Sequence, residues 1–312
     1  MRKAVVKCKR LIKSIIFFLR LGNAHLVEGG KYGIKNPQVL LRKAGVIQLT
    51  NGYKISFNPT NKYYVLKIVA LALSTGISFG KKMGQWDLDQ KREVIKTHQG
   101  IKFKFSSIDI LDETFLFQVH FSSFDLRNRI VITAGALMGD TPLFYAYYGA
   151  KVYAFEPDPK AFKLAKENIQ LNRKLSKNIT IMNYAIGRDG KVAFPIGEIP
   201  GGSSLYNTKA KNIINIRSVS ISTILKEFNV STPYLLDLDI KGAEFNVIED
   251  QSLSKFKRIR IEYSPYLTGV RKNSLRYLIH KLRTYGFNKI RIYKHTALRF
   301  DLMNHGTIEA EK

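Results

Sequence analysis

The chain of 312 residues is long enough for one large domain or two ordinary ones, and at 45% hydrophobic and 12% aromatic residues it can bury a core, which excludes a disordered chain or a fibre. It carries 51 Lys and Arg against 24 Asp and Glu, a formal net charge of +27, so an anionic partner is expected. The single cysteine, Cys8, excludes an intrachain disulfide framework and cysteine-rich zinc sites. The same cysteine usage indicates an intracellular protein. The histidines show no metal-ligand spacing, so we expect no metal.

The first part of the chain, residues 1–104, is predicted to be an accessory region. Residues 1–21 read as a basic amphipathic helix, which either lies on an anionic membrane surface or docks its apolar stripe on the protein's own core. Because apolar runs of about 18 residues are absent from the sequence, we expect no membrane span and a cytoplasmic location, with peripheral membrane contact through residues 1–21 as an open alternative. A hairpin with its turn at Asn51-Gly52 and a buried helix over Tyr63–Phe79 are predicted next.

From Arg129 the pattern alternates between strand, turn and helix, which is typical of a parallel sheet covered by helices. The first strand, Ile130–Thr133, leads into a turn containing Gly135, Ala136 and Gly139, and a helix is predicted to start at Asp140.

The second strand, Lys151–Phe155, ends at Glu156-Pro157, and Asp158-Pro159 starts a helix that runs to about Asn172. The later predicted elements are, in chain order, a strand at Ile179–Asn183, a hairpin excursion over Lys191–Tyr206, a helix near Ser222–Phe228, strands at Tyr234–Ile240 and Ile259–Tyr263, a helix at Ser274–Tyr285, and two strands at Lys289–Tyr293 and Leu298–Leu302 that close the sheet as a pair.

Two residues in this pattern point to a cofactor. A glycine turn after the first strand lets the backbone approach a ligand, and a carboxylate about 20 residues later, at the tip of the second strand, can accept both hydroxyls of a ribose. Gly135 and Glu156 are 21 residues apart. This geometry is common to dinucleotide and S-adenosylmethionine (SAM) sites, but the incomplete glycine pattern disfavours a dinucleotide.

Six segments, taken together, resemble the successive motifs of the FkbM-type SAM-dependent methyltransferases, in that family's order and spacing. The resemblance covers about residues 105–305, and we predict a methyltransferase domain over residues 105–312. The segments are VITAGALMGD (131–140), VYAFEPDP (152–159), ENIQLN (167–172), NYAIG (183–187), LLDLDIKGAE (235–244) and IEY (261–263).

The resemblance implies an α/β fold, a Rossmann-like class I methyltransferase sheet of seven strands with the last antiparallel and helices on both faces. It also implies SAM as the cofactor and O-methylation of a hydroxyl on a sugar, glycan or lipid-linked acceptor. The variable N-terminal part and the excursion over residues 191–217 are expected to shape the acceptor pocket.

Carried over residue by residue, the family's motifs place the cofactor and the acceptor on the same edge of the sheet. Asp239 and Glu244 are the predicted catalytic residues, with Asp239 as the base or acceptor-orienting group, and Glu262 ends the fifth strand. The structural alternative for Asp239 is the N-cap of a helix that begins near Gly242. The predicted cofactor residues are Thr133, Gly135, Ala136, Gly139 and Asp140 at the methionine end, Glu156 and Pro157 at the ribose, and Asn183, Tyr184 and Ala185 at the adenine.

Four residues depart from the family's pattern. Thr133 replaces the acidic residue that usually ends the first strand, and Leu137 replaces an Asn in the glycine turn. Asp237 stands where the family usually carries Lys, and Lys241 where it usually carries Glu. Because these two positions share strand parity, we hypothesise that they form an ion pair of reversed polarity. Two independent surface substitutions are the alternative.

Two other functions remain open. The net charge of +27 favours an RNA or other nucleic-acid methyltransferase, although Asp239-Ile240-Lys241-Gly242 lacks the proline and aromatic residue with which base methyltransferases stack a flipped base. The four departures favour a catalytically idle binding protein that keeps the fold.

Overall fold

The computed structural model describes residues 34–50, 52–79, 86–108, 110–115, 125–197, 212–264, 274–293 and 305–312. The chain forms two compact units, Met1–Gln118 and Val119–Lys312. The amphipathic helix predicted over residues 1–21 lies outside the described residues and stays a prediction. Within the described part of the chain, none of the helices combines the length and the apolar character that crossing a membrane requires.

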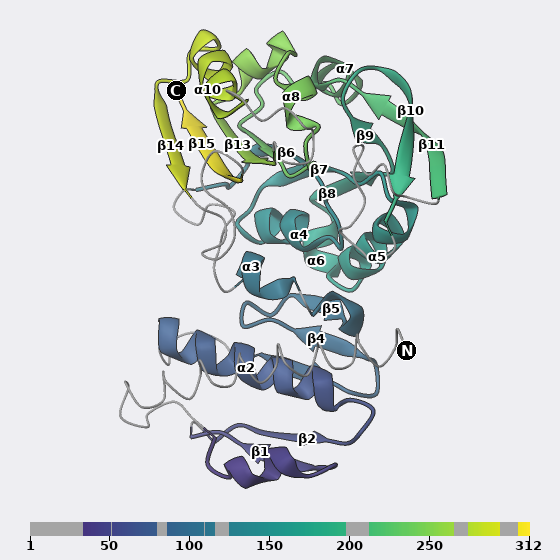
Figure 1. Cartoon of the computed structure of the whole chain (residues 1–312), viewed down its shortest axis with the longest axis vertical. Helices are drawn as coiled ribbons and strands as arrows, with labels where there is room; N and C mark the ends of the chain where they lie inside the picture. The colour runs from purple at the N-terminus through teal and green to yellow at the C-terminus, as the bar shows by residue number, and fades with distance from the viewer. Residues whose placement is uncertain are drawn as a thin grey trace. The chain divides into compact units, whose positions relative to one another are not determined.

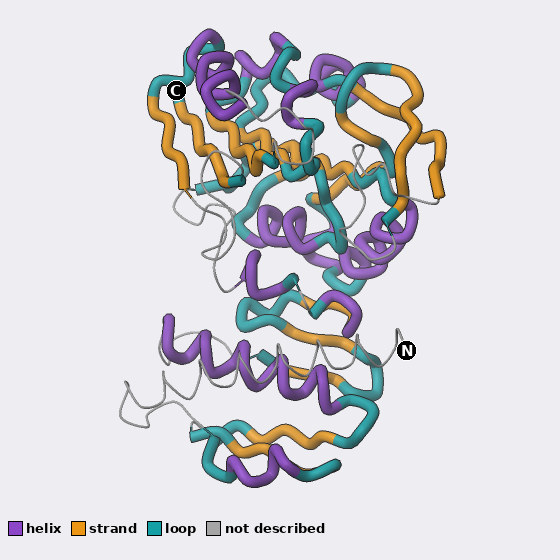
Figure 2. The backbone as a smooth tube through the Cα atoms, viewed as in Figure 1, coloured by secondary structure: helices purple, strands orange, loops and turns teal. Residues whose placement is uncertain are grey.

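The first unit contains the predicted hairpin and the predicted buried helix (Figures 1 and 2). The hairpin pairs β1 (Gly45–Gln48) with β2 (Lys54–Phe57), and Gly52 in its turn has a φ of +90°. The helix is α2 (Lys62–Phe79). The other described elements of this unit are η1 (Pro37–Leu41), the antiparallel strands β3 (Asp87–Asp89), β4 (Val94–Lys96) and β5 (Lys102–Lys104), η3 (Phe105–Ser107) and α3 (Leu111–Phe115).

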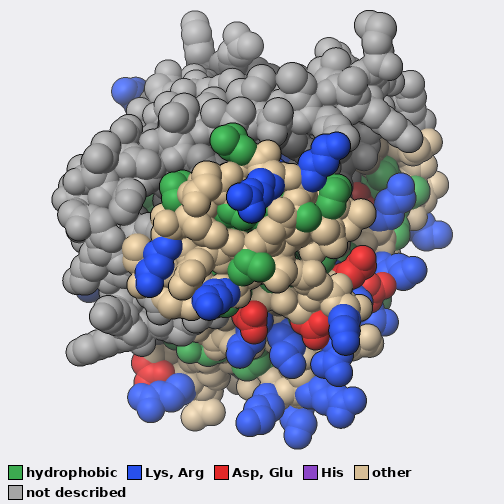
Figure 3. All heavy atoms as spheres, turned by 90° about the horizontal axis from the view of Figure 1, so that it is seen from below, with side chains coloured by type: hydrophobic (Ala, Val, Ile, Leu, Met, Phe, Trp, Pro, Cys, Tyr) green, Lys and Arg blue, Asp and Glu red, His purple; other side chains and the backbone are tan. Residues whose placement is uncertain are grey.

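Basic side chains are prominent on the surface. Among the described residues on the face drawn in Figure 3, Lys and Arg side chains are more numerous than Asp and Glu side chains, in keeping with the net charge of +27. This charge is compatible with an anionic partner but does not select one class of partner over another.

The second unit is built on a sheet that confirms the predicted fold class. In the described residues it has seven strands in the order β14-β15-β13-β12-β6-β7-β8, and β15 runs antiparallel to both of its neighbours while the other pairings are parallel. These strands are β6 (Ile130–Ala134), β7 (Lys151–Phe155), β8 (Ile179–Met182), β12 (Leu235–Leu238), β13 (Arg258–Tyr263), β14 (Lys289–Tyr293) and β15 (Gly306–Glu311).

Helices cover both faces of this sheet, as predicted (Figure 1). On one face, apolar residues of β6, β12 and β13 pack with apolar residues of α7 and α10 in a continuous core. On the other face lie α4, α5 and α6 (Figure 1). The helices of this unit are α4 (Asp140–Tyr147), α5 (Pro159–Gln170), α6 (Arg173–Ser176), α7 (Ile221–Glu227), α8 (Glu244–Val247), η4 (Gln251–Lys255) and α10 (Ser274–Thr284).

Two predicted elements need correction. The strand that pairs with β14 is Gly306–Glu311, which inserts between β14 and β13 and buries Thr307, Ile308 and Ala310. The segment predicted to pair with β14, Leu298–Leu302, lies outside the described residues. The return strand of the hairpin excursion likewise comes later than predicted. Strand β10 (Gly190–Ile196) pairs antiparallel with β11 (Asn212–Val219), which also pairs parallel with β9 (Ala185–Ile186).

Candidate functional site

A pocket opens at the carboxyl ends of β6, β7 and β12, the edge at which an open parallel sheet is expected to bind ligands. It contains about 710 Å³ of empty space, part of which is open solvent. The lining residues are Ala134, Gly135, Leu137, Phe155, Glu156, Pro157, Asp158, Ala161, Tyr184, Ala185, Ile186, Phe194, Asp239, Ile240, Lys241 and Ala243.

The glycine turn joins β6 to the ends of two neighbouring strands. The backbone N–H groups of Gly135 and Ala136 donate to the carbonyl oxygen of Phe155 at 3.0 and 3.1 Å. Gly135 has a φ of +87°, and a Cβ atom at this position would lie 2.1 Å from the carbonyl oxygen of Asp239. A glycine is therefore required here by the close approach of the chain after β12, in addition to the ligand approach expected from the sequence.

Three other residues of the turn and of the start of α4, namely Ala136, Gly139 and Asp140, do not line the pocket. Gly139 is the N-cap residue of α4, and Asp140, the first residue of the helix, is 6% exposed. Ala136 is fully buried. These three predicted cofactor residues are thus positioned behind the pocket wall, where they fix the turn that carries Gly135 and Leu137.

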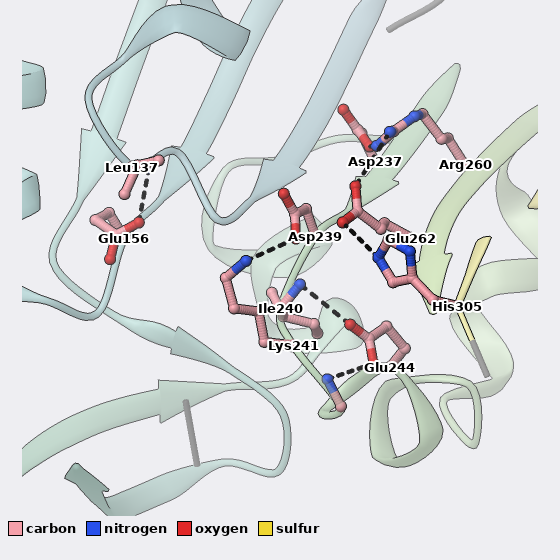
Figure 4. Close-up of polar contacts among 11 residues, drawn as sticks. Leu137, Glu156, Asp237, Asp239, Ile240, Lys241, Glu244, Arg260, Glu262 and His305 are labelled. Atoms are coloured by element: carbon pink, nitrogen blue, oxygen red, sulfur yellow. Dashed lines mark hydrogen bonds and ion pairs between the residues drawn. The ribbon is translucent and has the colours of Figure 1, made fainter. Parts of the chain in front are cut away.

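Glu156 lies at the tip of β7, inside the pocket. One carboxylate oxygen accepts a hydrogen bond from the backbone N–H of Leu137 at 2.7 Å (Figure 4). The other accepts one from the backbone N–H of Asp158 at 2.9 Å. Burial raises the pKa of Glu156 to about 8. Because each carboxylate oxygen has a further lone pair, the group can still accept hydrogen bonds from a vicinal diol.

The residues after β8 form another wall of the pocket. Asn183 donates through Nδ2 to the carbonyl oxygens of Glu156 at 2.8 Å and Pro157 at 3.1 Å, so it fixes the tip of β7 and does not itself line the pocket. Tyr184 does line it, and the guanidinium of Arg217 lies 4.7 Å from the Tyr184 ring centroid. A rigid aromatic ring at this wall is suited to packing against a flat base.

Asp239 follows β12 and faces the pocket with a side chain that is 33% exposed. Burial and the nearby Glu262 carboxylate raise the pKa of Asp239, while Lys241 and Arg260 act against this shift. The Lys241 Nζ atom lies 4.0 Å from Asp239 Oδ1 (Figure 4). The alternative role of Asp239 as a helix N-cap is wrong, because the N-cap residue of α8 is Ala243.

Glu244 faces the backbone of the turn after β12. Its carboxylate accepts from the N–H groups of Ile240 at 3.2 Å and Gly242 at 2.7 Å, and the residue is fully buried. Burial raises the pKa of Glu244 to about 8. Glu244 is not among the lining residues and lies beneath the pocket. The sequence predicted that it faces the acceptor, and in the structure its carboxylate faces the backbone of the turn.

A buried polar cluster lies beside the site, on the sheet face covered by α4. Asp237 accepts hydrogen bonds from Arg260 Nη1 at 2.8 Å and from the Tyr145 hydroxyl at 2.6 Å. Arg260 also lies 3.6 Å from Glu262, which in turn lies 3.3 Å from His305 Nε2 (Figure 4). Burial and Asp237 raise the pKa of the Tyr145 hydroxyl, which is therefore neutral near pH 7.

The hypothesis of an ion pair between Asp237 and Lys241 is wrong. Asp237 faces Arg260 in the sheet interior, whereas Lys241 faces Asp239 at the pocket. Strand β12 ends at Leu238 and Lys241 has a φ of +50°, so the strand parity from which the pairing was inferred does not continue to position 241. The cation opposite Asp237 comes from the neighbouring strand instead.

Thr133 occupies the middle of this sheet face. It pairs in register with Ala154 of β7 and Asp237 of β12, is 1% exposed and does not line the pocket. A substitution at this position therefore changes the buried row of side chains across the sheet and not the surface of the pocket.

Of the predicted site residues, six line one pocket: Gly135, Glu156, Pro157, Tyr184, Ala185 and Asp239. Among the lining residues that the sequence did not predict are Phe194 and Lys241. Phe194 comes from β10 and is brought in by long-range pairing that leaves no local signal. Lys241 stands inside a quoted motif, and its left-handed backbone conformation is what turns it toward the pocket.

Comparison with known proteins identified a matching family. The family model described as the methyltransferase FkbM domain matches residues 133–289, just over half of the 312 residues. No curated protein matches the sequence.

Solved methyltransferase structures show a general likeness. The N-terminal domain of human METTL16, in complex with SAH, is 17% identical over 89% of this chain and 91% of that chain, with a TM-score of 0.39. A precorrin-6y C5,15-methyltransferase from Geobacter metallireducens GS-15 is 10% identical over 73% and 95% of the two chains, with a TM-score of 0.34. An rRNA methylase from Streptococcus thermophilus is 16% identical over 60% and 89%, with a TM-score of 0.36.

Proposed function

The chain belongs to the methyltransferase FkbM domain family, a family of SAM-dependent methyltransferases, and from this premise we propose that it methylates a hydroxyl oxygen on a sugar, glycan or lipid-linked acceptor. The observation that carries the proposal is that Glu156 and Asp239 line the same pocket, at the carboxyl edge of the sheet. One carboxylate is suited to a ribose, and the other to a hydroxyl that must be oriented and deprotonated.

The residues of the pocket fit SAM. Glu156 would accept hydrogen bonds from the ribose hydroxyls, since its oxygens keep lone pairs beyond those used by Leu137 and Asp158. Tyr184, with Ala185 and Phe194, offers an apolar and aromatic wall for adenine. SAM supplies a methyl group on a positively charged sulfur, which an oxygen nucleophile can attack.

Asp239 is the residue proposed to act on the acceptor. Its carboxylate would accept a hydrogen bond from the acceptor hydroxyl and take up its proton as the oxygen is methylated. The raised pKa of Asp239 brings its basicity closer to that of a working base near neutral pH. The larger contribution is expected from positioning, because the hydroxyl must be held in line with the methyl group.

The turn after β12 supports a hydroxyl acceptor better than a flipped base. Asp239, Ile240 and Lys241 line the pocket, and this turn offers no aromatic ring on which a base could stack. Because the net charge of +27 also favours binding to a nucleic acid, the acceptor screen must be able to detect methylated RNA.

The function is tested by following a radioactive methyl group from SAM into a panel of acceptors. Fractions of free sugars, glycans, polar lipids and RNA are incubated with the protein, and we expect label in an alkali-stable form in a glycan or lipid fraction. Nuclease-sensitive label would contradict the proposal, and saturable SAM binding without transfer to any fraction would favour an idle binding protein.

Asp239→Asn is the matched variant for this assay. It keeps the shape of the side chain and removes the base, so we expect methyl transfer to fall by about 100-fold while the affinity for S-adenosylhomocysteine (SAH) changes little. Transfer at the wild-type rate would exclude Asp239 from the reaction. A parallel loss of SAH affinity would assign it to cofactor binding instead.

The affinity for SAH is expected to rise with pH between about 6 and 8. In the free protein the pKa of Glu156 is raised to about 8, so its carboxyl group is largely protonated at pH 6. Ribose hydroxyls that donate to the ionised form favour it, so binding below pH 8 releases a proton and tightens as pH rises, by at most about tenfold per pH unit.

Calorimetry in two buffers of different ionisation enthalpy measures this proton release directly. In Glu156→Gln the side chain does not titrate, so the pH dependence should flatten. An affinity that falls between pH 6 and 8 in the wild-type protein would refute the assignment of Glu156 to the ribose.

A further inference from the structure

The turn after β12 has an unusual backbone. Lys241 has a φ of +50° and the next residue, Gly242, has a φ of +102°. Glycine adopts this conformation readily, but a lysine does not, and such strain persists only where the surroundings impose it. The strain at Lys241 therefore needs a structural cause.

Glu244 supplies this cause. Its fully buried carboxylate accepts one hydrogen bond from the N–H of Ile240 and another from the N–H of Gly242, so it holds the backbone on both sides of Lys241 (Figure 4). By holding the backbone on both sides, the Glu244 carboxylate clamps the turn and sets the direction of the Lys241 side chain.

The clamped turn presents the Lys241 ammonium group to the pocket. The Lys241 side chain is 38% exposed, lines the pocket and lies 4.0 Å from Asp239 Oδ1. Among the described residues that line the pocket, Lys241 is the one basic residue, and the acidic ones are Glu156, Asp158 and Asp239. A ligand that carries both positive charge and a carboxylate matches this distribution.

The position of Lys241 indicates which end of a ligand it would meet. Tyr184 and Phe194 line the wall suited to adenine, whereas Gly135, Asp239 and Lys241 lie on the chain that leaves β6 and β12. If Glu156 holds the ribose, the amino-acid end of SAM would extend toward the second group, away from the aromatic wall.

We infer that Lys241, held by Glu244, binds the α-carboxylate of the cofactor's methionine portion through a charge-assisted hydrogen bond. The inference rests on the proposed use of SAM. It makes Lys241 a cofactor-binding residue and Glu244 a positioning residue for it, in place of the direct role toward the acceptor predicted for Glu244.

The test compares two ligands that differ in this carboxylate. SAH contains the amino acid, whereas 5′-methylthioadenosine has the same adenosine and thioether without it. Calorimetry with Lys241→Gln should show the affinity for SAH reduced by about tenfold or more and the affinity for 5′-methylthioadenosine unchanged. Lys241→Arg keeps the charge and should retain most of the SAH affinity.

Two further variants control the experiment. Lys255→Gln removes one charge at an exposed position of η4 outside the pocket lining and should leave the affinities for both ligands unchanged. Glu244→Gln, checked for folding by circular dichroism, should lower SAH affinity selectively because the amide NH₂ cannot accept a backbone hydrogen bond in place of a carboxylate oxygen.

The outcomes separate this inference from the proposed function. An equal loss of both affinities in Lys241→Gln, or no loss of SAH affinity, would overturn the inference while SAM use stands. Unchanged SAH affinity with reduced methyl transfer to an anionic acceptor would also overturn it, by assigning Lys241 to the acceptor. If neither ligand binds the wild-type protein, the proposed cofactor itself fails.

Discussion

Replacing Gly135 with alanine is expected to destabilise the second unit by about 2–5 kcal/mol and to abolish SAH binding. The left-handed φ of +87° would cost an alanine about 1–2 kcal/mol. The larger obstacle is steric, because the new Cβ atom would lie 2.1 Å from the carbonyl oxygen of Asp239. To relieve this overlap, the glycine turn and the chain after β12 must separate, which displaces two walls of the pocket at once.

Gly286→Ala is the matched control for this variant. Gly286 has the same φ of +87° and lies in the same unit. The Cβ atom added at Gly286 would have as its nearest neighbour the end of a flexible side chain, Lys312 Cε, at 3.8 Å. Its destabilisation should therefore stay near about 1–2 kcal/mol, with SAH binding intact. Equal effects of the two substitutions would show that the approach of Asp239 to Gly135 is not a constraint.

The measurement must report on the second unit. The single tryptophan, Trp86, lies in the first unit, so its fluorescence is not a suitable probe. Hydrogen exchange of the backbone amides in β6 and β12 under native conditions reports the opening free energy of the strands that carry the site.

Replacing Arg260 with methionine is expected to destabilise the same unit by about 3–5 kcal/mol. Arg260 is fully buried and donates to Asp237 at 2.8 Å, and Asp237 is itself 1% exposed. Without the guanidinium, the Asp237 carboxylate keeps the Tyr145 hydroxyl as a hydrogen-bond donor but loses its counter-ion. A buried charge left without its partner is among the larger sources of mutational instability.

The double variant Asp237→Leu/Arg260→Met distinguishes this reason from a simple loss of packing. Removing both charges removes the uncompensated carboxylate, so the double variant should be more stable than Arg260→Met alone. Hydrogen exchange in β12 and β13 again provides the free energies for a double-mutant cycle. If the two single effects add, the energetic coupling between the two charges is absent.

The order of elements around the pocket was predictable because its signals are local. Strands β6 and β7 are short buried runs, each followed by residues that stop a strand, at Gly135 and at Glu156-Pro157. These signals define a parallel unit with its ligand at the carboxyl edge. The hairpin at Gly52 and the helix α2 were likewise predictable from turn residues and an apolar run.

The errors arose where long-range pairing decides the structure. The local pattern near Leu298–Leu302 resembles a strand as much as that of Gly306–Glu311 does. The pairing of Gly306–Glu311 with both β13 and β14 is a long-range feature that the local pattern does not show. The partner of Asp237 was also assigned within its own segment. In the structure it is Arg260, its neighbour in register on β13, 23 residues later in the sequence.

The roles of individual site residues were the least predictable part. Asn183 and Glu244 carry the polar groups expected of a binding site, yet in the structure these groups hold backbone atoms in place. Strand parity paired Lys241 with Asp237, whereas in the structure Lys241 faces Asp239. Parity cannot anticipate a left-handed residue shortly after the end of a strand.

The central claim, that the pocket at Glu156 binds SAM, is tested most directly by calorimetric titration of the full-length wild-type protein with SAH and, separately, with NAD. We predict saturable binding of SAH at one site per chain and no heat of binding for NAD. Binding of NAD, or the absence of SAH binding at near-millimolar concentration, would contradict the account.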